Sequence, residues 1–528
     1  MNTMKKATAW MAALVLISGL TACQRNTDPD TSTSSTMGQV TSGQIQDAES
    51  TTAEATGEQT GATGGPNTPN SAQTTKATSN TNATTKGGQD QVWGKRSRNT
   101  TAPHAAVIDM KGAEIVLGTK WITDWGNGDP GDSVVGDKWI AWRKNFEKTF
   151  NCKLKNVYVS PYTLFSSIST KLMAGDKVAD VITMQLFDVE AFRHAGLLQE
   201  LQKVPNLNLD HPLVSQSMVD NFTYNGKSYM LAYNPIYSEV NGMYVNLDMI
   251  KELKLDNPLE LARQKKWTWK AFDKMCQAAY QDTNKNNKID SADRFGASFG
   301  PDFAMGSLRV SGIKVISYNN GRFSYTYNNP KTLSYLNAVK DTIKAGNRVV
   351  EASDGNAVHK KFVQKGLLFC AGDSGLRGSS EHVLWDPDFE VGYLPCPTHE
   401  EGMSYTNTCS TWLGGLSIPV NVNAKSLTNV GYLLNAAMEM TNSLAPESKK
   451  SLQRVMGTES YNLFMTYQDK FSVDAYCWQN EFKDLVKQTM DDTLFDNSVT
   501  PAKYLESIDT AMKNAVKDYY SKDPDLMS

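Results

Sequence analysis

The stretch LFSSISTKLMAGDKVADVITM, residues 164–184 of this 528-residue sequence, decides the fold class. Its first part, residues 164–174, predicts a helix, and residues 178–184 (VADVITM) predict a strand because they combine β-branched and other apolar side chains. Residues 157–159, just before the helix, predict another strand. A helix between two strands is typical of α/β proteins, in which the strands are mostly parallel.

The same alternation continues in both directions along the chain. Upstream, residues 114–123 (EIVLGTKWIT) predict a strand that is followed by a loop and by a helix at residues 139–150. Downstream, apolar side chains spaced three and four apart predict helices at residues 330–344, 428–441 and 502–519. The folded body therefore has α/β character and begins near Ala106.

The first residues carry an export signal. Lys5 and Lys6 precede an apolar run over residues 7–20, which is short for a transmembrane helix because such a helix needs about 20 apolar residues. The run ends in Leu20-Thr21-Ala22-Cys23, which resembles the lipobox of bacterial lipoproteins. We expect cleavage after residue 22 and a lipid on Cys23, which would hold the chain at the extracytoplasmic face of the membrane. The alternative is an ordinary secretory signal that contains a cysteine.

Residues 23–105 are expected to form a disordered tether. Met37, Val40, Ile45 and Val92 are the only large apolar residues between positions 24 and 92. Such a segment buries too little surface to offset the entropy lost on ordering. A flexible coil of about 70 residues spans roughly 45 Å, so the tether would let an anchored body sample the space above its membrane.

Charge and cysteine content narrow the functional classes. The net charge of −3 and the pI near 6.1 give no basic footprint for nucleic acid. Without Cys23, six cysteines remain, and this even number permits disulfides outside the cytoplasm. Cys396 and Cys409 are the best candidate pair, whereas the alternative is that all six are small buried apolar residues. The six are Cys152, Cys276, Cys370, Cys396, Cys409 and Cys477.

Several blocks in the body resemble family 1 extracellular solute-binding proteins, the receptors of carbohydrate ABC importers. Their order and spacing carry the resemblance, which covers nearly all of residues 106–528. The blocks are KLMAGD (171–176), ADVI (179–182), GLLQEL (196–201), NGKSY (225–229), YVNLD (244–248), WTW (267–269) and FEVGYLPCP (389–397). The tether and residues 301–315 depart from the family pattern.

The resemblance implies a two-lobed periplasmic-binding-protein-like fold of type II. It places residues 106–233 and 396–442 in one lobe and residues 234–395 and 443–528 in the other. Hinge crossings are then expected near residues 232–235, 395–397 and 441–444. The expected protein is a monomer that closes on a sugar or oligosaccharide and presents it to the permease subunits of an ABC transporter.

The resemblance also points to a ligand site on loops that follow the C-terminal ends of strands, as in open α/β sheets generally. Flat aromatic rings suit the apolar faces of sugars, and Asp, Asn, Gln and Arg suit their hydroxyl groups. Each aromatic residue can equally be a packing residue, and Trp267 and Trp269 are assigned to packing. The predicted ligand residues are Asp124, Trp125, Gln185, Phe187, Tyr233, Asn234, Tyr237, Asp373, Ser374, Arg377 and Trp412.

Residues 282–293 (DTNKNNKIDSAD) have the oxygen spacing of a calcium-binding loop. Asn287 replaces the usual Gly, and Asp293 replaces the usual Glu with a shorter arm. We expect a structural Ca²⁺ away from the ligand site, and the alternative is a solvated polar turn. The predicted metal ligands are Asp282, Asn284, Asn286, Lys288 (through its carbonyl), Asp290 and Asp293.

Other motifs give weaker predictions. Residues 126–131 fit GxGxxG, but Asp129, Pro130 and Asp132 argue against a dinucleotide site. Residues 372–375 (GDSG) lack a histidine in a familiar context for serine chemistry. The family resemblance therefore implies a binding protein rather than an enzyme. The runner-up is a secreted lipoprotein enzyme such as a glycoside hydrolase, whose paired carboxylates need not be near in sequence. A structural or adhesive lipoprotein comes third.

Overall fold

A computed structural model describes residues 107–120, 124–131, 134–160, 163–233, 240–319, 322–351, 355–374, 387–408, 414–472, 480–523 and 525. All of them belong to one compact unit, Thr85–Ser528. Cys23, the predicted signal peptide and the predicted tether lie outside the described residues. Within the described ranges, no helix is long and apolar enough to cross a membrane.

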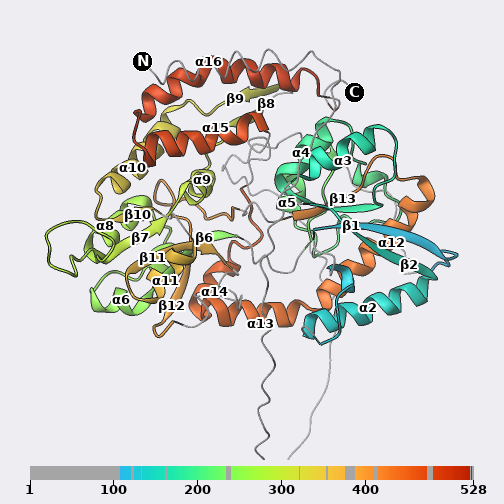
Figure 1. The fold of residues 1–528 in the computed structure, drawn as a ribbon, viewed down its shortest axis with the longest axis horizontal. Helices are drawn as coiled ribbons and strands as arrows, with labels where there is room; N and C mark the ends of the chain where they lie inside the picture. The colour runs from blue at the N-terminus through green and yellow to red at the C-terminus, as the bar shows by residue number, and fades with distance from the viewer. Residues whose placement is uncertain are drawn as a thin grey trace, which may run out of the picture. The chain divides into compact units, whose positions relative to one another are not determined.

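The first lobe is built on a four-stranded sheet with the order β13-β3-β1-β2 (Figure 1). Strands β1 (Ala113–Thr119), β2 (Cys152–Tyr158) and β3 (Val181–Gln185) are parallel, and β13 (Gly414–Ser417) runs antiparallel to β3. The α/β class with mostly parallel strands is thereby confirmed.

Helices cover both faces of this sheet. Val181 belongs to the apolar cluster shared with α2 (Val134–Phe150) and α12 (Ala424–Ser443). Ile182, the next residue, belongs to the cluster shared with α3 (Leu164–Met173) and α4 (Leu186–His194). Successive residues of a strand point to opposite faces, so β3 is buried on both sides, as parallel strands usually are.

The second lobe is built on a five-stranded sheet with the order β10-β7-β11-β6-β12. Strands β7 (Phe295–Phe299), β10 (Val349–Glu351) and β11 (Leu367–Asp373) are parallel. β6 (Asn241–Asn246) runs antiparallel to both of its neighbours, β11 and β12 (Val391–Pro395).

Several helices pack around this sheet. α8 contacts β7 and β11, α11 also contacts β11, and α6, α7, α13 and α14 contact β12. Their bounds are α6 (Leu247–Glu252), α7 (Pro258–Arg263), α8 (Trp269–Ala279), α11 (Gly355–Val363), α13 (Ala445–Met456) and α14 (Thr458–Met465).

The antiparallel strands show where the chain passes between the sheets. β6 is the first strand of the second sheet along the chain, and β13 is the strand with which the chain returns to the first sheet. The chain passes a third time at Leu444, which ends α12 and precedes α13. α12 contacts α2 and β1, whereas α13 contacts α14 and β12. The residue limits predicted for the two lobes remain a prediction.

A further layer belongs to the second lobe. Its hairpin, β8 (Ile316–Asn319) and β9 (Arg322–Tyr325), is contacted by α16 (Pro501–Tyr520), which also contacts α10 (Pro330–Lys344) (Figure 1). α15 (Asn480–Met490) contacts α9 (Pro301–Val310) and continues into a π-helical turn (Asp491–Phe495).

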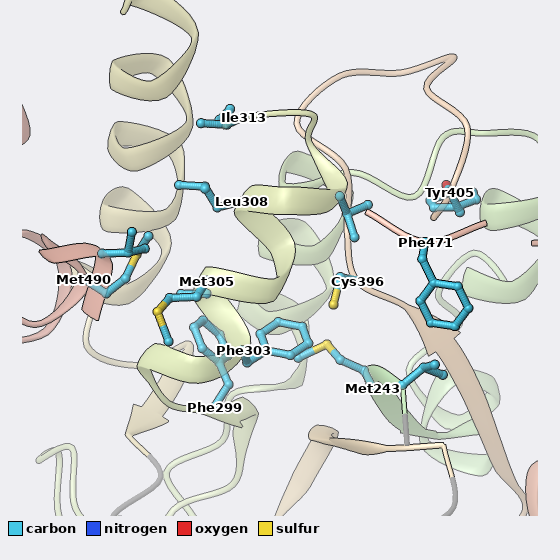
Figure 2. Close-up of a cluster of buried hydrophobic side chains, with 14 of the residues drawn as sticks. Met243, Phe299, Phe303, Met305, Leu308, Ile313, Cys396, Tyr405, Phe471 and Met490 are labelled. Carbon is cyan, nitrogen blue, oxygen red and sulfur yellow. The ribbon is translucent and has the colours of Figure 1, made fainter. Parts of the chain in front are cut away.

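α9 accounts for the segment that the family pattern did not place. Phe303, Met305 and Leu308 come from this helix and pack into one buried apolar cluster with Met490 of α15 and Met243 of β6 (Figure 2). The segment is therefore part of the core of the second lobe rather than a surface loop.

Local sequence explains where several helices begin. The side chains of Asn329, Asn423 and Thr500 accept a hydrogen bond from a backbone N–H in the first turn of α10, α12 and α16. Pro330 and Pro501 follow two of these caps, where the missing N–H of proline costs nothing. The three predicted C-terminal helices are confirmed with small shifts in their ends.

Trp267 and Trp269 are core residues, as predicted. Their side chains are 0% and 2% exposed. The Trp267 Nε1–H donates to the Pro395 carbonyl at 2.9 Å, and the Trp269 Nε1–H donates to Ser307 Oγ at 2.7 Å. Both polar groups are satisfied, so neither ring has a free edge for ligand.

Candidate functional site

The turn after β1 carries two predicted ligand residues, Asp124 and Trp125. It is a single 3-10 turn, Asp124–Gly126, and Trp125 adopts left-handed backbone angles of φ 59° and ψ 33°. Gly126 makes the turn possible, since a Cβ atom there would lie 2.3 Å from the Trp139 carbonyl oxygen of α2. The turn is therefore pressed directly against a helix.

Side chains from β2 and α2 fix the same turn. The Asn156 amide donates to the Asp124 carbonyl at 2.6 Å. Arg143 donates to Asn156 Oδ1 at 2.9 Å and to the Trp125 carbonyl at 3.5 Å. Partial burial lowers the pKa of this guanidinium, and Glu147 opposes that shift. The turn is thus preorganised by the protein itself.

Trp125 combines a packing role with a partly exposed ring. Its ring centroid lies 6.4 Å from that of Trp139 and 6.4 Å from that of Trp142, both on α2. It packs against the first-lobe core but is not fully buried. Aromatic packing on one side leaves the remaining surface for contact with a flat apolar ring face.

Gln185 is the last residue of β3 and also the N-cap of α4. It pairs with Gly414 of β13 and is 5% exposed. Because β1 and β3 are parallel neighbours, the turn after β1 and Gln185 follow the same edge of the sheet. Phe187 lies in the first turn of α4, and its side chain is outside the described part of the structure.

In the second lobe, Asp373 is the last residue of β11 and pairs with Asn241 of β6. The Tyr244 hydroxyl donates to the Asp373 carbonyl at 2.8 Å. Ser374 follows, is fully buried, and donates its N–H to the Val240 carbonyl at 2.9 Å. Its burial gives no support to a serine nucleophile in the GDSG segment.

Three buried hydroxyl groups lack a hydrogen-bond partner among the described residues. They are Thr119 Oγ1 at the end of β1, Ser374 Oγ directly after β11, and Thr408 Oγ1 on the segment between β12 and β13. Thr119 and Thr408 are 0% exposed. A buried hydroxyl without a partner is costly, so these positions are where water or ligand oxygens would complete the bonding. No motif in the sequence indicates Thr119 or Thr408 as a site residue.

Tyr233 lies where the chain leaves the first lobe. It forms an isolated bridge with Val214 and packs against the first-lobe core. Burial raises the pKa of its phenol, and a hydrogen bond with the side chain of Thr441, at the end of α12, partly offsets this. Tyr233 thus links two of the three predicted crossings. Four further predicted ligand residues lie outside the described ranges: Asn234, Tyr237, Arg377 and Trp412.

The oxygen-rich loop, residues 282–293, is folded around its own side chains. Asp282 accepts the backbone N–H groups of Asn286 at 3.2 Å and Asn287 at 2.8 Å. The side-chain amides of Asn284 and Asn286 donate to Asp290, and the bond from Asn286 is the main reason that the pKa of Asp290 is lowered. These hydrogen bonds connect four of the six predicted metal ligands within the loop.

The end of this loop is attached to the second lobe. Asp293 accepts the N–H groups of Thr283 and Asp290, at 3.3 Å and 3.1 Å. Lys361 donates to the Ser291 and Asp293 carbonyls, each at 2.8 Å. Asn287 has φ 58°, the left-handed conformation that the usual Gly provides. The conformation therefore fits a calcium loop.

Residues 282–293 could offer a cation several kinds of oxygen ligand. Among the described residues, no group of three or more His, Cys, Asp or Glu side chains could hold a metal ion. A cation in this loop would need amide and carbonyl oxygens together with carboxylates, a combination that Ca²⁺ accepts. Calcium binding here stays a prediction.

The Cys396–Cys409 disulfide is not supported, because Cys396 is free. Its thiol lies in the apolar cluster that also contains Met243 and Phe303, 3.7 Å from the Asn241 carbonyl, and burial raises its pKa to about 12 (Figure 2). Cys152, Cys276 and Cys370 are also free and buried. The alternative of small buried residues therefore holds for these four, and Cys409 and Cys477 lie outside the described residues.

Comparison with known proteins matches residues 131–426 to the bacterial extracellular solute-binding proteins. An ABC substrate-binding protein, Lmo0181, from Listeria monocytogenes in complex with cycloalternan has a TM-score of 0.52 at 14% identity, covering 78% of this chain and 99% of that one. A cyclic alpha-maltosyl-1,6-maltose binding protein from Arthrobacter globiformis has a TM-score of 0.51 at 14% identity, covering 77% and 100%.

A third solved structure, UgpB from Mycobacterium tuberculosis in complex with glycerophosphocholine, has a TM-score of 0.50 at 14% identity and covers 76% of this chain and 98% of that one. At these identities the likeness shows the two-lobed fold. A search of curated proteins finds no match.

Proposed function

The chain belongs to the bacterial extracellular solute-binding proteins, and we propose that it captures a sugar or oligosaccharide by closing its two lobes and delivers it to the permease of an ABC importer. The observation that carries the proposal is the pair of sheets joined by three passages of the chain, with polar side chains at the C-terminal ends of strands in both. Such an arrangement lets one ligand contact both lobes, so that binding favours the closed state.

The chemistry of the described residues suits a sugar. Trp125 offers a partly exposed aromatic face on a fixed turn, which favours the apolar face of a pyranose ring. Gln185, Asp373 and the unpartnered hydroxyls of Ser374, Thr119 and Thr408 offer hydrogen-bonding groups. A ligand that failed to satisfy these groups would bind weakly because they would remain unpaired.

The family consists of binding proteins, and we propose that this chain binds its ligand without turnover. No described constellation favours the alternative of a glycoside hydrolase. The two solved neighbours named for oligosaccharides support a sugar ligand, whereas the neighbour bound to glycerophosphocholine makes a phosphodiester the relevant competitor.

We also propose that Cys23 carries a lipid and that residues 24–105 tether the body to the outer face of the membrane. Two acyl signals give stable anchoring where one is marginal. A tethered receptor stays at a high effective concentration near its permease. Replacing Cys23 by Ser should release the protein into the medium, whereas retention in the membrane fraction would contradict the anchor.

A structural Ca²⁺ in residues 282–293 is a separate proposal. It is supported by the hydrogen bonds that draw the loop's oxygen-bearing side chains together, those of Asp282, Asn286, Asp290 and Asp293. The left-handed conformation of Asn287 supports it as well. The ion would stiffen one edge of the second lobe without contacting ligand, since the loop follows α8 and precedes the N-terminal end of β7 rather than the C-terminal end of a strand.

Calorimetry tests the proposed function directly. The protein is titrated with mono- and oligosaccharides and with glycerophosphocholine, and each mixture is then assayed for products. Saturable binding of a saccharide without turnover supports the receptor. Trp125→Ala should weaken that binding, with Trp139→Ala as a control that removes a ring from the same aromatic cluster. Unchanged affinity in Trp125→Ala would remove Trp125 from the site.

A further inference from the structure

Arg193, in the last turn of α4, is the centre of a fully buried ion cluster. Its side chain is 0% exposed, and each of its three nitrogens donates to a carboxylate. Nε and one terminal nitrogen form a bidentate pair with Glu190 of the same helix, at 2.8 Å and 2.7 Å. The guanidinium lies 4.0 Å above the Tyr224 ring.

The other carboxylates come from the far end of the chain. Asp523 accepts two hydrogen bonds from Arg193, at 2.9 Å and 2.6 Å, and Asp525 accepts one at 2.9 Å. Neighbouring carboxylates raise the pKa of Arg193 well above its usual value even though desolvation acts in the opposite direction. The Asp525 N–H also donates to Asp523 Oδ1 at 2.9 Å, which orients the two aspartates together.

Further contacts attach the same segment to the first lobe. Asp525 Oδ1 accepts from the Tyr229 hydroxyl at 2.8 Å and from Lys227 Nζ at 3.1 Å. The ring of His194, the residue after Arg193, stacks on Tyr519 at 3.9 Å and bonds to the Tyr519 carbonyl at 3.0 Å. These partners lie on α4 and on or directly after the hairpin formed by β4 (Thr223–Tyr224) and β5 (Lys227–Ser228).

The segment itself emerges from the second lobe. It directly continues α16, which packs on β9 and α10. Tyr520, the last residue of α16, stacks on Phe323 of β9 at 3.7 Å. One short stretch of chain is therefore fixed to the second lobe at Tyr520 and to α4 and its neighbours three and five residues later.

We propose that Tyr519–Asp523 and Asp525 form a strap, a buried noncovalent connection between the lobes that limits how they open. Each covalent passage can absorb a hinge rotation through a few backbone angles. The strap cannot do so freely, because movement there would separate desolvated charges, and breaking a buried ion pair is strongly unfavourable. Opening is therefore expected to keep the two lobes together at Arg193.

The strap is independent of the identity of the ligand, so its test needs none. Spin labels are placed on the full chain at Met173→Cys, at the end of α3, and at Gln277→Cys, on α8; both positions are exposed. Distance distributions are then measured by pulsed electron paramagnetic resonance. The four described native cysteines are buried, and the labelled wild-type chain supplies the background.

Asp523→Asn with Asp525→Asn is expected to broaden the distance distribution and shift it to larger values. Glu190 is then the only one of the three carboxylates left to pair with Arg193. The matched control, Glu506→Gln with Asp518→Asn, removes the same charge from exposed positions of α16 and should leave the distribution unchanged. An unchanged distribution in the Asp523 and Asp525 variant with a native circular dichroism spectrum would overturn the strap. If that variant does not fold, Asp525→Asn alone is measured and interpreted in the same way.

Discussion

The oxygen-rich loop at residues 282–293 and the Arg193 cluster are both constellations of charged and polar groups, yet they are built in opposite ways. In the loop, most hydrogen-bond partners lie within twelve residues of chain, apart from contacts such as the one from Lys361, and the side chains are largely exposed. In the cluster, the partners of Arg193 include residues 330 and 332 positions away, and the side chains are buried. The loop can therefore be recognised in the sequence, whereas the cluster exists only in the fold.

The cluster and the loop also differ in how much they stabilise the fold in the absence of a bound ion. The cluster is complete in itself, since each buried donor of Arg193 faces a carboxylate. The oxygens of the loop accept hydrogen bonds from within the loop, and the proposed Ca²⁺ would use the same oxygens. We therefore expect the cluster to dominate stability in the absence of metal, and the loop to contribute most when Ca²⁺ is present.

The largest effect is expected for Arg193→Met. This change leaves Glu190, Asp523 and Asp525 buried without their cation. Breaking a buried pair by removing one partner costs about 3–5 kcal/mol. Urea unfolding of the variant and the wild type would measure the loss, and a cost of about 1 kcal/mol or less would show that water enters the cluster.

A smaller and conditional effect is expected from calcium. Any ligand that binds only the folded state stabilises it by about 2.7 kcal/mol at a concentration of 100 times its Kd. Adding Ca²⁺ to metal-stripped protein should therefore raise the melting temperature. Asp290→Asn should abolish this rise while keeping the hydrogen-bonding shape of the side chain, and Mg²⁺ provides the control cation. If excess Ca²⁺ produced no rise in the wild type, the loop would be a solvated turn.

The backbone of the loop provides the next smaller effect. Asn287 has φ 58°, a conformation that costs most residues about 1–2 kcal/mol but that Asn and Gly adopt readily. Asn287→Ala should lower the free energy of unfolding by about 1 kcal/mol, whereas Asn287→Gly should leave it nearly unchanged. Equal stabilities of the two variants would argue against the left-handed conformation.

The smallest effect is expected for an exposed ion pair, which contrasts with the buried ion pairs of Arg193. Lys513 and Asp509 are four residues apart on α16 with a nitrogen–oxygen distance of 2.7 Å. Exposed pairs of this kind contribute about 0.3–0.5 kcal/mol. Lys513→Ala should thus change the unfolding midpoint only slightly, and the change should shrink further in high salt.

The same distinction explains how much of the molecule the sequence could predict. Patterns contained in one segment were informative: the helix at residues 164–174 matches α3 closely, the strand at 178–184 overlaps β3, which begins three residues later, and Pro330 begins α10. Strand limits were less accurate. β1 ends at Thr119, whereas the prediction continued to residue 123, because the apolar pattern does not stop where the hydrogen-bonded pairing with β2 stops.

Features that depend on distant residues were not predictable. The Cys396–Cys409 pairing relied on closeness in sequence, but Cys396 is buried beside Asn241 in the core. Trp125 was correctly placed on a turn, but its contacts with Trp139 and Trp142 follow from the way the turn folds back on α2. Thr119 and Thr408 carry no local pattern, since only burial makes an unpartnered hydroxyl conspicuous.

The central claim is that two lobes close on a ligand that is not chemically changed. Small-angle X-ray scattering of the protein, with and without a saturating amount of the tightest-binding saccharide, tests it most directly when the saccharide is recovered and analysed afterwards. Closure of the lobes predicts a smaller radius of gyration in the complex, and binding without turnover predicts an intact saccharide. An unchanged radius with saturable binding, or a hydrolysed saccharide, would contradict it.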